Sequence, residues 1–414
     1  MCRPADPDGH LETLEGFDIV CLGPVEWLVV RSVAEPTMLC LSRKNRVLFV
    51  EPFRSVAGLI RETRRQRRRP RLRWGLRQED RGLWVYSPPP LGIPGTSRWW
   101  WPPEVNGWIL NRLLRRVMRT LGFDRPLVWT FLLESAGAVR RLPGRLSIYD
   151  CIDQYEALVR SERVLGRVRT LEAELCRQAD LVFGITEGLV SRRRALNPHT
   201  FEVNGATDLE HARKALLETT RVPADLACLG RPVVGYLGSI DPWKIDVSLL
   251  TQIARARPHW KIALVGYVWF GFDPGVFREF PNIRLLGPKR YDEFPGYLKG
   301  MDVCIMPFLL NEITRNGESM KCYDYLAAGK AVVSTPVPSA RRLSSVVRIA
   351  DSAEAFISAI EASLPDSRDA VARRLAAVTP YTWERRVEEK SRLILRRLGE
   401  REGREVPPLA GRSA

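Results

Sequence analysis

The sequence has few of the residues that build metal sites or covalent cross-links. Only four histidines occur in 414 residues, and they are widely separated, so we expect no metal site. Eight cysteines are scattered without a C-x-x-C pair, which favours a reducing, cytoplasmic compartment. No apolar run approaches the ~20 residues of a membrane-spanning helix, and residues 1–16 lack the apolar core of a signal peptide. We therefore expect a protein that is soluble or peripheral to a membrane.

Positive charge is abundant, and it is unevenly distributed. The chain has 64 Lys and Arg against 48 Asp and Glu, a net charge of +16. Residues 1–222 contribute +10 of this excess, and eight arginines lie between Arg61 and Arg73. With 45% hydrophobic residues, the composition is that of a globular protein and excludes collagen-like or disordered chains. The charge pattern predicts an anionic partner for the first half of the chain.

Short β-branched or aromatic runs alternate with stretches of helical period along the whole chain. This alternation predicts α/β domains with parallel sheets covered by helices. We predict a Rossmann-like domain over residues 1–222, a second over 223–378, and a terminal helix over 379–414 that packs toward the first domain before a disordered tail. Strands are predicted at 18–23, 47–50, 83–86, 127–131, 146–149, 181–185 and 200–203, and then at 233–238, 261–266, 283–287, 303–307, 331–335 and 346–350.

Two motifs in the second half carry candidate binding residues. Gly238 follows a predicted strand and precedes Lys244; the glycine allows a ligand to approach the backbone, and the lysine can reach a phosphate. Further on, Ser319 is a predicted N-cap, so Lys321 and Asp324 share a face of the following helix. A lysine beside a carboxylate suits a phosphate and vicinal hydroxyls. A plain glycine turn and a solvated ion pair are the alternatives.

The run Tyr323-Asp-Tyr-Leu-Ala-Ala-Gly-Lys-Ala-Val-Val333 resembles the E-Y-L-A-x-G-x-P-V-V segment of GT-B glycosyltransferases. Ordered similarity extends from about residue 18 to 398, and the sequence is similar to bacterial transferases that build cell-surface polysaccharides, such as those of the teichuronic-acid type. The resemblance implies two Rossmann-like domains facing a central cleft. It also implies transfer of a hexose from a UDP- or GDP-sugar, bound by the second domain, to an acceptor bound by the first.

Carried over residue by residue, the resemblance places the donor ribose at Asp324 and the diphosphate at Lys244, with Lys321 beside it. The turn at Gly266 and the loop ending at Arg290 would flank the sugar-phosphate and the base. Three positions depart from the family pattern: its earlier carboxylate falls on Asn316, with Glu318 nearby but out of register; its ribose glutamate is Asp324; and its usual arginine after Gly238 is Ser239.

In the first domain, Asp150 and Asp153 follow a predicted strand. Their spacing is not the D-x-D of metal-dependent transferases, so we expect metal-independent catalysis in which lysines stabilise the leaving group. Asp153 is the candidate acceptor contact or general base; capping of the next turn is the alternative. Arg31 aligns with an arginine often found at this position in the family, and we expect it to face the cleft; a solvated arginine is the alternative.

The arginine run from Arg61 to Arg73 has no recognised nucleic-acid module beside it, so we expect no nucleic acid as a partner. We interpret the run as a peripheral contact with the anionic inner face of the cell membrane, which would bring the enzyme to a lipid-linked glycan acceptor. Trp99–Trp101 and the helix after it are consistent with this, although ordinary packing of that helix is the simpler explanation. A solvated helix end is the alternative for the run.

Other functions stay open at this stage. Asn316 and Ser239 are compatible with a sugar-nucleotide-binding or membrane scaffold protein that has lost turnover. An epimerase with the same fold, which acts on the nucleotide-sugar itself, is a third interpretation. Nucleic-acid binding through the arginine run would show a steep salt dependence.

Overall fold

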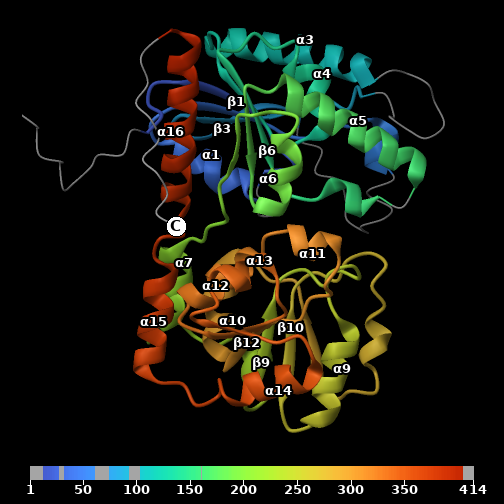
Figure 1. The fold of residues 1–414 in the computed structure, drawn as a ribbon, viewed down its shortest axis with the longest axis vertical. Helices are drawn as coiled ribbons and strands as arrows, with labels where there is room; N and C mark the ends of the chain where they lie inside the picture. Colours follow the sequence, from blue (N-terminus) through green and yellow to red (C-terminus); the bar gives the residue numbers. More distant parts are fainter. Residues whose placement is uncertain (1–12, 28–31, 61–73, 93–102, 160, 404–414) are drawn as a thin grey trace, which may run out of the picture. The chain divides into compact units, whose positions relative to one another are not determined.

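A computed structural model describes residues 13–27, 32–60, 74–92, 103–159 and 161–403. The chain divides into two compact units: residues 1–203 with 384–414 form the first unit, and residues 204–383 form the second (Figure 1). Arg31, the run from Arg61 to Arg73 and Trp99–Trp101 lie outside the described residues, so the interpretations placed on them remain predictions.

The first unit is built on an eight-stranded sheet in the order β3-β4-β2-β1-β5-β6-β7-β8. Every pairing is parallel except that of β3 with β4. The predicted strands are present, because their apolar β-branched residues are buried on both faces of the sheet. The strands are β1 (Asp18–Leu22), β2 (Arg46–Val50), β3 (Gly75–Asp80), β4 (Leu83–Ser87), β5 (Leu127–Thr130), β6 (Leu146–Cys151), β7 (Leu181–Gly184) and β8 (Thr200–Glu202).

Helices accompany these strands in the order expected for a doubly wound domain. They are α1 (Ala34–Ser42), α3 (Pro103–Leu121), α4 (Ala136–Val139), α5 (Glu162–Gln178), α6 (Glu187–Arg194) and the terminal α16 (Trp383–Arg401), with short 3-10 turns at Leu133–Ser135 and Tyr155–Leu158. Helix α16 belongs to the first unit because its apolar side chains, among them Ile394, join that unit's core. Its Lys390 also forms a buried ion pair with Asp150 at the end of β6.

The second unit has a six-stranded, fully parallel sheet in the order β11-β10-β9-β12-β13-β14. This is the strand order of a Rossmann domain, whose ligands bind at the carboxyl ends of the strands. The strands are β9 (Val233–Leu237), β10 (Lys261–Val265), β11 (Ile283–Gly287), β12 (Val303–Met306), β13 (Ala331–Ser334) and β14 (Val347–Ile349).

Helices α9 and α14 of the second unit pack together, and α12 packs with α7, α13 and α15. The helices are α7 (Leu209–Arg213), α8 (Ala224–Ala227), α9 (Val247–Ala256), α10 (Phe294–Gly300), α11 (Glu312–Asn316), α12 (Met320–Ala327), α13 (Pro338–Arg342), α14 (Ala353–Glu361) and α15 (Arg368–Val378), with 3-10 turns at Lys214–Leu216, Pro274–Phe277 and Tyr291–Glu293. The predicted class, two doubly wound α/β domains, is confirmed.

The boundary between the units differs from the one that the sequence suggested. We expected the first domain to end at residue 222, but residues 204–222 belong to the second unit. The reason is packing: α7 lies against α10 and α12, and the 3-10 turn after α7 lies against α10. Within the part of the chain that the structure describes, no helix is long and apolar enough to span a membrane.

Candidate functional site

Glycine turns follow the first three strands of the second unit's sheet. Gly238 follows β9 and Gly266 follows β10, with φ angles of 150° and 153°, and Gly287 ends β11 with a φ of 71°. The N–H of Gly238 donates to the carbonyl of Val265, and the N–H of Gly266 donates to the carbonyl of Gly287. A Cβ atom added to Gly266 would lie 1.9 Å from the carbonyl oxygen of Gly238. Gly238 and Gly266 therefore leave no room for a side chain, because the Lys321 side chain and the Gly238 carbonyl lie where their Cβ atoms would be.

Lys321, in the first turn of α12, lies directly against the first of these turns. A Cβ on Gly238 would fall 1.9 Å from the Cε of Lys321, and the Nζ of Lys321 lies 5.6 Å from the centre of the Tyr236 ring. Burial lowers the pKa of Lys321 to about 8, and the positive charge of Lys244 acts in the same direction. The structure thus brings Lys321 close to Gly238 and Lys244, which lie far from it in the sequence.

Helix α12 is held in this position by a residue that sequence reasoning missed. The Tyr325 hydroxyl accepts from the N–H of Leu237 at 2.8 Å and donates to the carbonyl of the same residue at 3.1 Å. Its neighbour Asp324 accepts from the Thr207 hydroxyl at 2.5 Å. The tyrosine fixes the helix to the end of β9, and the threonine orients the carboxylate. Ser319, which we expected to cap this helix, stands at the N-cap position without a side-chain capping bond.

The loop after Gly238 contributes a second residue that sequence reasoning missed. Asp241 is 4% exposed and accepts a hydrogen bond from the Ser239 hydroxyl at 2.9 Å. Its carboxylate is close enough to Lys321 to oppose the fall in that lysine's pKa. Ser239 therefore orients an acid here. The sequence could have indicated this acid, because Asp241 lies three residues before Lys244 in the same candidate loop.

Glu318 and Asn316 have different surroundings. The Glu318 side chain is fully buried, where it accepts from the Tyr323 hydroxyl and forms an ion pair with Arg342 at 2.8 Å. The Glu318 carboxylate therefore has partners within the second unit, and the donor-binding role that we expected of it stays a prediction. Asn316, the last residue of α11, donates from its Nδ2 to the carbonyl of Glu312 at 3.1 Å.

The remaining candidates each have contacts of their own. Arg290 forms an ion pair with Asp292 at 2.7 Å, and its side chain is 81% exposed. Asp153 belongs to the first unit, where its carbonyl oxygen accepts from the N–H of Tyr155. Asp150, its partner in the D-x-x-D spacing, is buried in the ion pair with Lys390 and also accepts from the Trp129 indole N–H at 3.2 Å. Asp150 therefore has a structural role.

The cluster of Gly238, Lys244, Lys321 and Asp324 has the chemistry of an anion site beside a hydroxyl acceptor. The like charges of Lys321 and Lys244 are stabilised when an anion binds between them. A carboxylate nearby accepts hydrogen bonds from vicinal hydroxyls. Glycine turns at the carboxyl ends of parallel strands let a phosphate-bearing ligand approach the backbone.

Comparison with known protein families agrees with this description. Residues 231–366, most of the second unit, match the family described as glycosyl transferases group 1. A similar curated protein is the putative teichuronic acid biosynthesis glycosyltransferase TuaH of Bacillus subtilis, 27% identical over 219 residues, which are 47% of this chain and 52% of that protein. The match thus spans about half the length of the curated relative.

Solved structures share the architecture over most of the chain. Sucrose-phosphate synthase from Thermosynechococcus elongatus is 14% identical with a TM-score of 0.66, over 92% of this chain and 98% of that one. HepE from Anabaena, solved with UDP and glucose, is 15% identical with a TM-score of 0.60, over 92% and 99%. Identity this low shows the fold alone. The chain therefore has the GT-B fold, and residues 231–366 are similar to the group 1 glycosyltransferases.

Proposed function

We propose that the protein is a metal-independent glycosyltransferase. It transfers a hexose from a UDP- or GDP-sugar, held by the second unit, to a glycan acceptor. The observation that carries this proposal is the contact of Lys321 with the Gly238 turn, in a domain of the group 1 family. Lys321 and Lys244 neutralise the diphosphate and stabilise it as it departs. Asp324 accepts from the ribose hydroxyls.

The pathway and the acceptor are also part of the proposal. Similarity to a teichuronic acid glycosyltransferase supports a role in cell-surface polysaccharide synthesis. The run from Arg61 to Arg73 supports a lipid-linked acceptor at the inner, anionic face of the cell membrane, with the protein peripheral to it. In this role the first unit binds the acceptor, and Asp153 contacts it or acts as its general base.

The experiment measures release of nucleoside diphosphate from a panel of UDP- and GDP-sugars in the presence of a membrane lipid extract. We expect turnover by the unaltered protein and its loss in Lys321→Ala and Asp324→Ala. Arg373→Ala, which removes an exposed arginine on α15, is the control and should keep full activity. Equal rates in the unaltered protein and both site variants would contradict the proposal.

The same panel separates the two other functions considered for this fold. A sugar-nucleotide-binding protein without turnover would be stabilised against heat by a donor and would release no diphosphate. An epimerase would convert the donor without an acceptor. Either result would replace glycosyl transfer as the function while leaving the donor site in place.

A further inference from the structure

A cavity of about 350 Å³ opens beside the carboxyl ends of β12 and β13 in the second unit. Leu310, Arg315, Pro336, Pro338 and Arg341 line it. Its size is at the lower end of the range for small-molecule sites, ~300–1,000 Å³. The leucine and the two prolines form apolar walls, and the two arginines supply the charge. No candidate residue of the donor site is among them.

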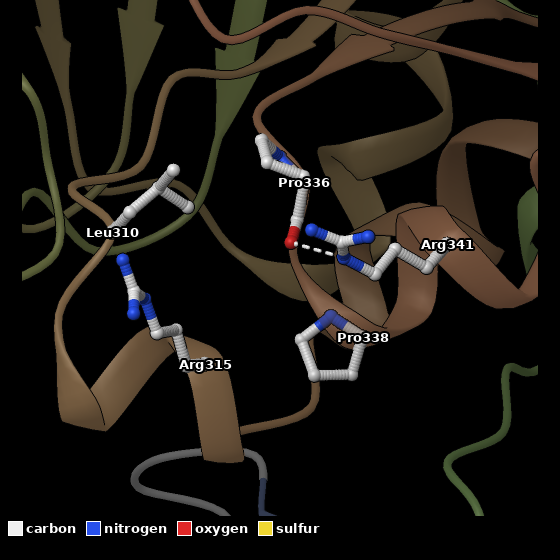
Figure 2. A pocket seen from close by; sticks show the side chains of 5 residues that line it. All are labelled: Leu310, Arg315, Pro336, Pro338 and Arg341. Atoms are coloured by element: carbon white, nitrogen blue, oxygen red, sulfur yellow. Dashed lines mark hydrogen bonds between the residues drawn. The ribbon is translucent and has the colours of Figure 1, made fainter.

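Both arginines direct their guanidinium groups toward the space between α11 and α13 (Figure 2). Arg341 donates from its Nε to the carbonyl of Pro336 at 3.0 Å, which fixes the side chain. Among the described residues, neither Arg315 nor Arg341 forms an ion pair. The buried acid nearby in the sequence, Glu318, is already paired with Arg342. Two guanidinium groups at one cavity without a carboxylate repel each other until an anion binds between them.

The cavity lies on the same edge of the sheet as the two lysines. The loop that carries Leu310 is fastened to the loop that carries Lys244: the N–H of Leu309 donates to the carbonyl of Lys244 at 2.8 Å. The Asn311 side chain donates to the carbonyl of Trp243 at 2.7 Å. These contacts, all within the second unit, join the start of α11, which carries Arg315, to the loop of the proposed diphosphate site.

We propose that this cavity is an anion subsite that recognises a carboxylate or phosphate group on a substrate sugar. Planar guanidinium groups bind such anions through paired N–H···O bonds, and the proline and leucine walls suit the apolar face of a sugar ring. One of the two substrates is therefore an acidic sugar. This inference rests on the proposed function, and it deepens it by naming the class of sugar.

Calorimetric titration of the full chain tests the subsite with two pairs of ligands. UDP-glucuronate against UDP-glucose tests a carboxylate on the donor, and glucose 6-phosphate against glucose tests a phosphate on the acceptor. We expect the unaltered protein to prefer the acidic member of at least one pair. Arg315→Gln and Arg341→Gln should each lower the affinity for that acidic ligand roughly tenfold and leave the affinity for its neutral counterpart unchanged. The control is Arg373→Gln, which should bind every ligand as the unaltered protein does.

The pair that shows the preference identifies the source of the anion. Equal affinities within both pairs, or arginine variants that bind like the control, would overturn the subsite. Titration with UDP alone tests the donor site separately. Lys321→Met should weaken the binding of UDP, whereas both arginine variants should bind UDP as the unaltered protein does. If Lys321→Met leaves the affinity for UDP unchanged, the proposed donor site is wrong. The comparison of glucose 6-phosphate with glucose then still tests whether the cavity binds an anion.

Discussion

Protonation of Lys321 should couple the binding of a nucleoside diphosphate to pH. Burial and the neighbouring Lys244 lower the pKa of Lys321 to about 8, so about half of the unbound molecules carry the ammonium at pH 8. A bound diphosphate is an anion and favours the ammonium, so binding raises this pKa and takes up a proton. Near pH 8 we expect uptake of about half a proton for each nucleotide bound. The affinity should then fall as the pH rises above 8.

Titration calorimetry with UDP or GDP, between pH 7.5 and 9 in two buffers of different ionisation enthalpy, measures this uptake. Lys321→Met should abolish it. Lys244→Met removes one of the two causes of the lowered pKa, so the region of proton uptake should move to higher pH. Uptake that stays the same in Lys321→Met, or an affinity that is constant across this range, would refute the assignment of the coupling to Lys321.

Two further predictions concern the structural supports. Gly266→Ala should sharply reduce nucleotide affinity, because its Cβ would lie 1.9 Å from the carbonyl oxygen of Gly238. Gly230→Ala is the control: this glycine also has a positive φ, but the space around it is open, so nucleotide affinity should be kept. Equal affinities in the two variants would contradict the role of the tight turn at Gly266. Lys390→Met should destabilise the first unit by about 3–5 kcal/mol, since it leaves Asp150 buried without its cation. Adding Asp150→Asn should recover much of that loss in chemical denaturation, and no recovery would contradict the buried pairing.

Much of the fold could be predicted because a strand buried on both faces leaves a clear pattern. The apolar runs at β9 and β10, for example, are bounded by glycine and match the structure closely. Strand β3 was missed because Gly75–Asp80 lies at the edge of its sheet and is polar, without the alternation that marks a half-buried strand. The start of the second unit at residue 204 was also not predicted, because only tertiary packing assigns α7 to that unit.

The candidate site was predictable in part. The spacing of motifs after strands located Gly238, Lys244, Lys321 and Asp324, and parallel strands bring such positions to one edge. The contacts that hold them were not predictable: Tyr325 lies in an ordinary helical pattern, and only the structure shows its hydroxyl bound to the end of β9. Nor does the sequence show that the carboxylate of Glu318 pairs with Arg342, since that ion pair joins the loop before α12 to the last residue of α13.

A crystal structure of the protein with a bound nucleoside diphosphate tests the donor site most directly. The account predicts diphosphate oxygens within about 3 Å of the Nζ atoms of Lys321 and Lys244, at the Gly238 turn, with the ribose hydroxyls at the Asp324 carboxylate. A nucleotide bound with its phosphates away from both lysines would contradict the account.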